Sequence, residues 1–293
     1  MKYKRTIGST IFDVTNHTLM FMLMLITLYP IWYVLVASFS DSATLEYYTG
    51  LLVTPLGFST EAYRAVMNNP KVWLGYKNTL IYVTTGTAVN IMMTSIGAYV
   101  LSRRKFFWKN IIMKGIIVTM YFGGGLIPTY LVMRNIGLYN NLWVMILPGA
   151  IGTWNLIIMR TSFMSIPYEL EESAKLDGAS DWTILFKIVL PLSLPVIAVM
   201  ILYYGVGRWN GWFNAMIYLR DERKYPLQLI LKSILIENQT AAMAAEEAGI
   251  EKNKVAETIK YATIMVATVP ILMVYPFLQK YFVKGVMIGA LKG

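Results

Sequence analysis

Residues 165–191 read SIPYELEESAKLDGASDWTILFKIVLP, a polar stretch that ends in an apolar run. Ser165 is a favoured residue type at a helix N-cap, and Pro167 suits a first helical turn. Acidic residues such as Glu169 follow at once, where the positive end of a helix dipole favours them. The pattern predicts a helix at about 168–176.

A glycine turn and a second helix follow in the same stretch. Gly178 can adopt the positive φ with which many helices end, and Ser180 can cap the next helix. That helix runs on into apolar sequence, where Pro191 and Pro195 predict a kink. We therefore expect a helix, a sharp turn and a kinked helix within the 160–187 loop and just beyond it.

The sequence around this loop is strongly apolar. Hydrophobic residues make up 56% of the 293 residues, charged residues only 14%, and the mean hydropathy is +0.52. A helix that spans a membrane needs about 20 apolar residues. Six stretches meet this requirement and contain no Asp, Glu, Lys or Arg: 17–39, 78–101, 115–133, 142–159, 188–204 and 261–279.

We therefore predict an all-α, polytopic membrane protein with six transmembrane helices and one transmembrane domain over residues 1–293, its core at about 78–282. The fourth stretch has the least certain boundaries, because it contains Pro148, Gly149 and Gly152. The first is long enough to be a retained span rather than a signal peptide.

The basic residues predict the orientation. The formal net charge is +10, and with six spans the basic N-terminus, residues 102–110, the 160–187 loop and the C-terminus share one side. The positive-inside rule makes that side cytoplasmic. A cytoplasmic placement of the basic segments explains the net positive charge better than nucleic-acid binding does. We expect a multi-pass protein of a bacterial inner or plasma membrane, with both termini in the cytoplasm.

Several chemistries are excluded or disfavoured. The chain has no cysteine, which excludes disulfides and Cys-ligated metals. His17 is the only histidine, so we expect no metal site. No Gly-x-x-x-x-Gly-Lys-Ser/Thr loop is present to hold ATP phosphates. An intramembrane enzyme would need paired acids or a Ser–His pair, and none is visible. A secondary transporter remains an alternative, although proton carriers commonly place ionisable groups in their spans.

The polar loop resembles the signature of permease subunits of binding-protein-dependent ABC importers. That pattern is Glu-Ala-Ala, three residues, Gly, nine residues, Ile, one residue, Leu-Pro. Glu172-Ser173-Ala174, Gly178, Ile188 and Leu190-Pro191 meet every spacing, and Ser173 is the one departure. The alternative is an interfacial amphipathic helix without a partner.

Two further segments are similar to the carbohydrate branch of that family, the maltose-importer type. One is the sequence WNGWFN at 209–214, and the other is the C-terminal sequence at 285–293. The resemblance implies a subunit, not itself an enzyme, of an ATP-driven importer for saccharides. A permease heterodimer, two ATP-binding subunits and an external solute-binding protein would complete it. A permease homodimer, the identity of the saccharide and its charge stay open.

The resemblance also implies roles for particular residues. The partner ATPase would bind ATP and Mg, and this chain would hold no cofactor. The residues expected to couple to the ATPase are Glu171, Glu172, Ser173, Ala174, Asp177, Gly178, Ala179 and Pro191. Those expected to reach the ATPase dimer from the C-terminal tail are Gly289, Lys292 and Gly293.

The substrate path should present aromatic faces and amides, because sugars have apolar faces and hydroxyl edges. The candidates are Tyr121, Tyr130, Trp154, Asn155 and Trp209. Packing is the more common role of an aromatic residue in a membrane helix. The glycines at 123–125 fit either a broken helix or close helix packing, and we favour packing.

Overall fold

A computed structural model describes residues 7–247 and 256–290. Within these ranges the chain is helical, and the only strand-like feature is an isolated bridge between Ser40 and Phe58. The predicted all-α class is confirmed. Contacts divide the chain into two compact units: unit 1 comprises residues 1–69 and 233–269, and unit 2 comprises 70–232 and 270–293.

Unit 1 contains the long apolar helix α1 (Ile7–Ser38) and two short helices, α2 (Ser42–Glu46) and α3 (Glu61–Met67). Most side chains of α1 are exposed, as expected of a helix whose solvent is lipid. Its C-terminal end packs in a small apolar cluster with Leu45 and Tyr261. Residues 17–38 of the first predicted span, 17–39, therefore lie within one continuous helix.

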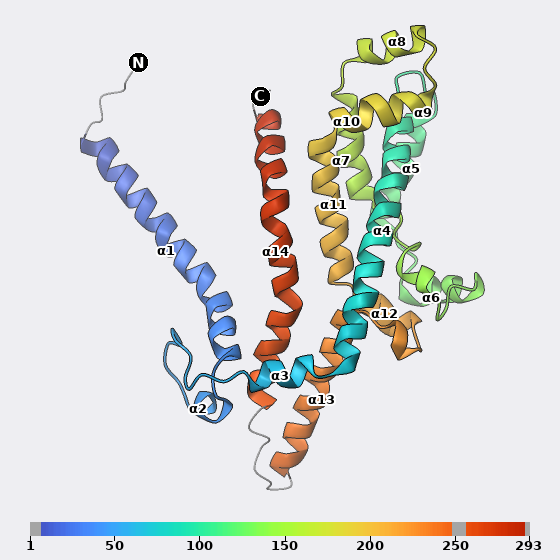
Figure 1. The fold of residues 1–293 in the computed structure, drawn as a ribbon. Helices are drawn as coiled ribbons and strands as arrows, with labels where there is room; N and C mark the ends of the chain where they lie inside the picture. The colour runs from blue at the N-terminus through green and yellow to red at the C-terminus, as the bar shows by residue number, and fades with distance from the viewer. Residues whose placement is uncertain (1–6, 248–255, 291–293) are drawn as a thin grey trace. The chain divides into compact units, whose positions relative to one another are not determined.

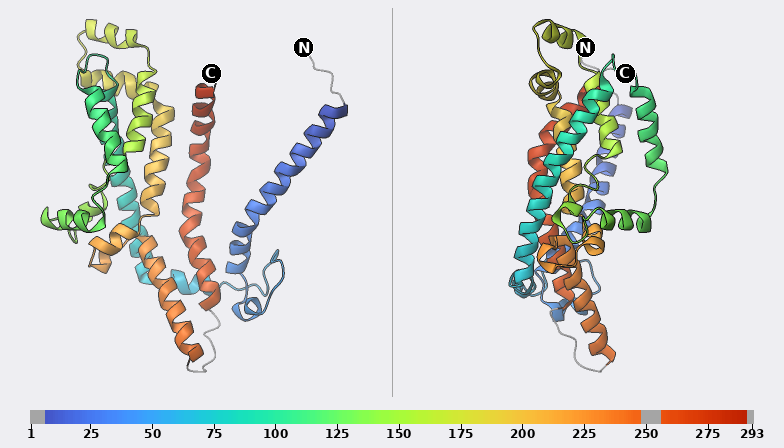
Figure 2. Two further views of the ribbon diagram at one scale, coloured as in Figure 1. Left: turned by 180° about the vertical axis from the view of Figure 1, so that it is seen from behind. Right: turned by 90° about the vertical axis from the view of Figure 1, so that its right-hand side faces the viewer.

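Unit 2 is built on three helices that pack side by side: α4 (Pro70–Ser102), α7 (Thr153–Met164) and α11 (Leu194–Trp209) (Figures 1 and 2). Their shared core includes fully buried Met159, Phe163 and Met200. This core holds α11 in place. The polar loop 160–187 lies before the start of α11, and Arg208 lies in its last turn.

The third predicted span is not a single helix. It divides into α5 (Lys109–Tyr121) and α6 (Leu126–Asn135), which meet at 115° (Figure 2, right). Gly125 has a φ of 81° at the break, which L-residues rarely adopt. Among the described residues, a Cβ on Gly123 or Gly125 would meet nothing within 4 Å, and one on Gly124 would meet only Pro128 at 3.8 Å, so close packing within this part of the chain does not explain these glycines. The expectation of packing was wrong, and the broken helix is correct.

The fourth predicted span, 142–159, is also not one helix. It begins with a 3₁₀ turn, η1 (Leu142–Met145), continues without regular structure through 146–152, and becomes helical only in α7. Pro148 removes a backbone donor, and Gly149 stands at φ 157°. The carbonyl groups of this segment need partners from other elements.

The bounds of the fifth predicted span, 188–204, differ at both ends from those of the observed helix. The first residues of this span belong to the π-helical turn η2 (Leu185–Val189) and to α10 (Leu190–Leu192), which follow the short helix α9 (Asp181–Ile184). This segment meets α11 at 85°, so the predicted proline kink is confirmed, and the continuous helix begins only at Leu194. Because α11 ends at Trp209, it contains Arg208. The helix therefore extends beyond the predicted span 188–204, which itself contains no Asp, Glu, Lys or Arg.

The remaining elements are α12 (Phe213–Tyr218), the 3₁₀ turn η3 (Glu222–Lys224), α13 (Leu227–Glu247) and α14 (Ala256–Ala290). Two described helices, α1 and α4, are each long and apolar enough to span a membrane, and the two bent pairs raise this number to four. A shorter apolar stretch, Thr258–Val274, lies in α14. The count of six and the single domain over 1–293 stay predictions.

Candidate functional site

The polar loop forms the helix α8 (Tyr168–Leu176), with the bounds that the sequence predicts. Its start differs from the prediction. Ser165 is the C-cap of α7, and its hydroxyl donates to the Ser162 carbonyl at 2.7 Å. Pro167 is the N-cap residue of α8 and has extended ψ. A proline fits here because the first N–H groups of a helix have no intrahelical acceptor.

The end of α8 is a glycine turn, as predicted. Gly178 has a φ of 80°. Its N–H donates to the Lys175 carbonyl at 3.1 Å, and the Ala179 N–H donates to the Ala174 carbonyl at 2.9 Å. This pair of bonds is the Schellman arrangement, in which a residue with positive φ closes the helix. Ser180 then caps α9 by accepting from the Thr183 N–H at 3.2 Å.

Glu171 lies on the inner face of α8 and is buried, with 7% of its side chain exposed. One carboxylate oxygen pairs with the guanidinium of Arg103, just beyond α4, and the other accepts from Lys175 at 2.8 Å. Arg103 also donates to Ser102 at 2.9 Å. A buried carboxylate needs such partners to remain charged. This ion pair fixes α8 to the end of α4.

A second set of contacts extends this attachment to α9. The ammonium group of Lys175 lies 3.5 Å from the Asp181 carboxylate, and the Tyr99 hydroxyl donates to the same carboxylate at 3.3 Å. The pKa of Lys175 is raised above its ordinary value, chiefly because its ammonium donates to Glu171. Side chains from α4, α8 and α9 thus form one charged network.

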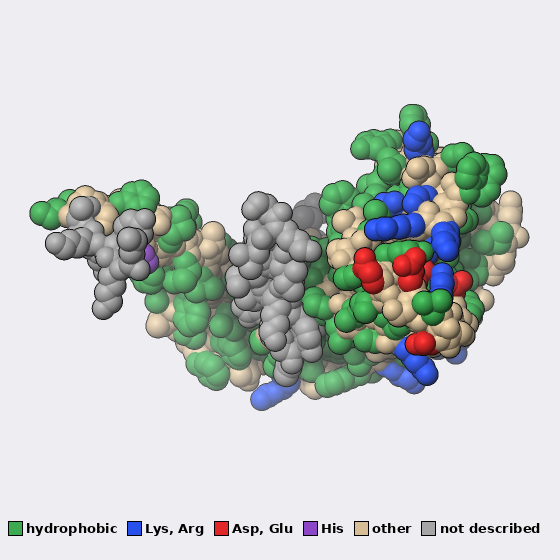
Figure 3. All heavy atoms as spheres, turned by 90° about the horizontal axis from the view of Figure 1, so that it is seen from above, with side chains coloured by type: hydrophobic (Ala, Val, Ile, Leu, Met, Phe, Trp, Pro, Cys, Tyr) green, Lys and Arg blue, Asp and Glu red, His purple; other side chains and the backbone are tan. Residues whose placement is uncertain are grey.

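The outer face of α8 is exposed. Four of the predicted coupling residues are exposed: Glu172, Ser173, Asp177 and Gly178. Leu176 lies among them, with 90% of its area exposed. Figure 3 shows that the end of unit 2 carrying α8 combines Lys and Arg with Asp and Glu side chains. A polar helix with an exposed leucine at its tip is a surface that a protein partner can cover.

Three other predicted coupling residues face inward or lie at the bend. Ala174 and Ala179 are half-buried and pack against the unit 2 core, so their small size lets α8 lie close to it. Pro191 is exposed in α10, next to the bend between η2 and α11. Of the predicted tail residues, Gly289 lies in the last turn of α14, whereas Lys292 and Gly293 lie outside the described residues.

The five substrate-path candidates are spread over unit 2. Tyr130 is packed, since its ring stacks on Tyr218 with centroids 5.9 Å apart. Tyr121 and Trp154 are 78% and 62% exposed, and Asn155 is half-buried near the start of α7. Their role stays a prediction.

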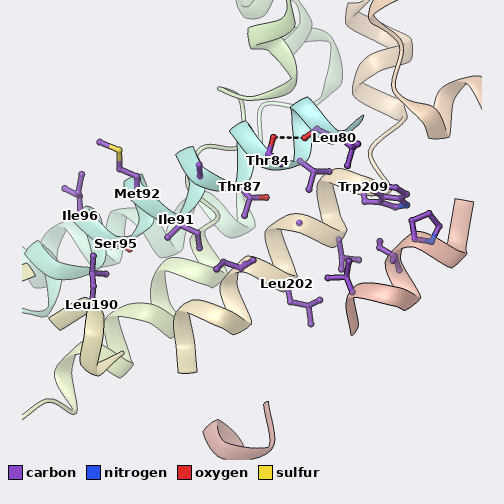
Figure 4. A pocket seen from close by; sticks show the side chains of 18 of the residues that line it. Leu80, Thr84, Thr87, Ile91, Met92, Ser95, Ile96, Leu190, Leu202 and Trp209 are labelled. Carbon is purple, nitrogen blue, oxygen red and sulfur yellow. Dashed lines mark hydrogen bonds between the residues drawn. The ribbon is translucent and has the colours of Figure 1, made fainter. Parts of the chain in front are cut away.

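Trp209 is buried and lies at one end of a groove of about 770 Å³ (Figure 4). The groove lies among α4, α11 and α14, and residues such as Leu202, Ile91 and Met92 make its lining almost wholly apolar. None of the other four candidates lines it. Such a lining suits an apolar side chain or a lipid chain better than a sugar.

A polar centre that the sequence pattern did not indicate lies at the end of α11 opposite α8. The guanidinium of Arg208 donates to Asn90 Oδ1 at 2.7 Å and to the carbonyl groups of Met145 and Ile146. Asn90, fully buried in α4, donates in turn to the Ala150 carbonyl at 3.0 Å. Between them, these two side chains bind four carbonyl groups in and just before the irregular 146–152 segment: those of Met145, Ile146, Gly149 and Ala150. A search for polar residues just after the apolar window would have found Arg208.

Comparison with known proteins adds independent findings. The profile of a family described as "Binding-protein-dependent transport system inner membrane component" matches residues 91–288. The chain is 41% identical over 285 residues to the polygalacturonan/rhamnogalacturonan transport system permease protein YtcP of Bacillus subtilis (strain 168), covering 97% of this chain and 99% of that protein. It is 40% identical over 290 residues to protein LplC of the same organism, with 98% and 97% covered.

A solved structure is also similar. It is a crystal structure of a bacterial ABC transporter involved in the import of the acidic polysaccharide alginate. One of its chains superposes with a TM-score of 0.84 and 34% sequence identity, covering 95% of this chain and 99% of that chain.

Proposed function

Because this chain belongs to the family of binding-protein-dependent transport system inner membrane components, we propose that it is a channel-forming subunit of an ATP-driven saccharide importer. In this role it passes a saccharide, and more specifically an oligo- or polysaccharide, from an external binding protein to the cytoplasm. The relatives that transport polygalacturonan, rhamnogalacturonan and alginate support a saccharide substrate.

The observation that carries the proposal is the geometry of α8. Its inner face is fixed to α4 by the Arg103–Glu171 pair, and its outer face presents Glu172 and Leu176 to a partner. A helix held rigidly on one side and exposed on the other can transmit a push without bending. We assign this outer face to docking with the ATP-binding subunit, which supplies the ATP site that this chain lacks.

The same geometry gives a route for motion into the membrane. A partner that moves α8 also moves α9 and η2, because Lys175 and Tyr99 join α8, α9 and α4 through Asp181. The 85° bend before α11 then lets this segment pivot as a rigid body against the span. ATP binding by the partner favours one conformation, and hydrolysis releases it, so the energy enters as differential binding to two states.

The remaining partners and the orientation follow from the same proposal. The α8 end and both termini face the cytoplasm, and the end of α11 that carries Arg208 faces outward. A second permease subunit, two ATP-binding subunits holding ATP and Mg, and an external solute-binding protein complete the importer. The C-terminal residues Gly289, Lys292 and Gly293 reach toward the ATPase dimer. The permease domain of this chain itself carries no cofactor.

The proposal is tested by co-purification and by ATPase stimulation. Tagged chain, expressed with the proteins encoded beside it, should bring down an ATP-binding subunit. In proteoliposomes, ATP hydrolysis should rise when the binding protein and an oligogalacturonide are added together, and not with either alone. A chain that purifies without an ATPase and takes up solute in response to a proton or sodium gradient would instead be a secondary transporter.

A further inference from the structure

A second cavity, of about 350 Å³, lies in unit 2 at the end of α11 opposite α8. It is formed by α4, the irregular segment after η1, the last turns of α11, and the start of α12. Its lining differs from that of the apolar groove, since it includes an arginine, three amides and five aromatic rings. The lining side chains used below are Arg208, Asn210, Asn214, Tyr203 and Trp212.

The cavity carries a positive charge that no carboxylate in the described part of the chain balances. Arg208 lines the cavity, no Asp or Glu does, and Arg208 forms no ion pair with a described residue. A second cation lies close by, because the ammonium of Lys232 sits 3.1 Å from the centre of the Trp212 ring. An ionisable group within a membrane helix is costly and in general marks a functional site.

The guanidinium also retains hydrogen-bonding capacity. It has five N–H donors, and three of them are used by Asn90, Met145 and Ile146, which leaves one on each terminal nitrogen. Gly86 makes this placement possible, since a Cβ there would lie 2.5 Å from the Arg208 Cζ. The three bonds hold the guanidinium fixed, so it is preorganised for a further acceptor.

The rest of the lining fits a sugar ring. Asn210 and Asn214 are exposed, and their side chains form no hydrogen bond with a described residue. Tyr203 is 45% exposed, and Trp212 is half-buried beside Phe213. Amide groups can bind hydroxyls, and aromatic faces can cover the apolar face of a pyranose.

We propose that this cavity binds a uronate residue of an acidic saccharide, with its carboxylate at Arg208 and its hydroxyls at Asn210 and Asn214. Carboxylate and guanidinium form strong charge-assisted hydrogen bonds. The inference rests on the proposed importer function and adds to it a substrate charge and a subsite on this chain. It makes this chain, and not only the external binding protein, a determinant of specificity.

The test is equilibrium dialysis with the permease–ATPase complex in nanodiscs, without the binding protein. The probes are radiolabelled trigalacturonate and its carboxyl-reduced, uncharged counterpart. Wild type should bind the acid at least about fivefold more tightly than the neutral probe, and the preference should fall as salt rises from about 0.05 M to about 0.5 M.

Asn214→Asp is the decisive variant, because it places a carboxylate in the cavity without removing any bond to Arg208. It should weaken trigalacturonate binding about five- to tenfold. It should weaken binding of the neutral probe much less, because an aspartate can still accept hydrogen bonds from sugar hydroxyls and repels only the charged probe. Asn135→Asp, at an exposed residue of α6 that does not line the cavity, is the matched control and should change neither.

The inference would be overturned if wild type bound both probes equally or bound neither. It would also be overturned if Asn214→Asp and Asn135→Asp had equal effects on binding. Uptake by the complete importer separates this failure from that of the proposed function. A complex that imports a saccharide on ATP but shows no carboxylate preference contradicts the subsite alone. A complex that imports no saccharide at all contradicts the proposed function, and the subsite with it.

Discussion

The guanidinium of Arg103, at the end of α4, pairs with the buried carboxylate of Glu171 in α8. The next residue, Glu172, is exposed. Two adjacent glutamates therefore have different roles: Glu171 attaches the helix to its own chain, and Glu172 is free to meet another. The difference gives predictions that separate attachment from docking.

Breaking the attachment should lower stability and coupling together. Arg103→Ala leaves the Glu171 carboxylate buried with only Lys175 beside it, which should lower the free energy of unfolding by about 3 kcal/mol. Thermal unfolding in detergent and substrate-stimulated ATPase activity measure the two effects. The exchange Arg103→Glu with Glu171→Arg should recover part of both. An unchanged melting temperature in Arg103→Ala would contradict the attachment of α8 to α4.

Reversing the outer charge should lower coupling without affecting stability. Glu172 is exposed and forms no ion pair or side-chain hydrogen bond with a described residue, so the melting temperature of Glu172→Lys should stay near that of wild type. Its stimulated ATPase activity and uptake should both fall severalfold. Glu237→Lys, on an exposed part of α13, is the control for charge reversal. Normal uptake in Glu172→Lys would remove this residue from the docking face.

A side chain at Gly178 should disrupt the turn through the backbone alone. A Cβ there would meet nothing within 4 Å, but φ 80° is strained for any other residue by about 1–2 kcal/mol. Gly178→Val should therefore unwind the end of α8 and uncouple ATP hydrolysis from uptake. Gly115→Val, in open space within α5, should couple normally. If ATP hydrolysis is coupled to uptake equally well in both variants, the turn at Gly178 is not needed for coupling.

A methyl group at Gly86 should displace Arg208. The added carbon would lie 2.5 Å from the guanidinium, so the bond to Asn90 must break or the helices must separate. We expect Gly86→Ala to lower the free energy of unfolding by about 1–3 kcal/mol. Gly205→Ala is the control, since its nearest neighbour would be 3.9 Å away. Equal melting temperatures of the two variants would argue against a fixed Arg208.

The sequence predicted the local structure of the loop well, because local rules determine it. The bounds of α8, the positive φ of Gly178, the cap at Ser180 and the bend near Pro191 all depend on residues only a few positions apart. The role of Ser165 was wrong because a serine at the end of one helix fits the start of the next equally well.

The irregular spans were harder to predict. Hydropathy reports how apolar a stretch is, and it cannot distinguish a straight helix from the broken pair α5–α6 or from the non-helical segment before α7. Those segments depend on partners distant in sequence. Arg208 satisfies carbonyl groups 62 and 63 residues earlier, and Arg103 meets Glu171 across 68 residues. No local pattern contains such pairings.

The most direct test of the central claim is a crosslink from the tip of α8. The chain has no cysteine, so Leu176→Cys introduces a unique thiol at a site that is 90% exposed. With a short thiol-reactive crosslinker in assembled membranes, it should join the chain to the ATP-binding subunit. Ile136→Cys, 60% exposed after α6, should not. No crosslink from Leu176→Cys, or the same crosslink from both positions, would contradict docking through α8.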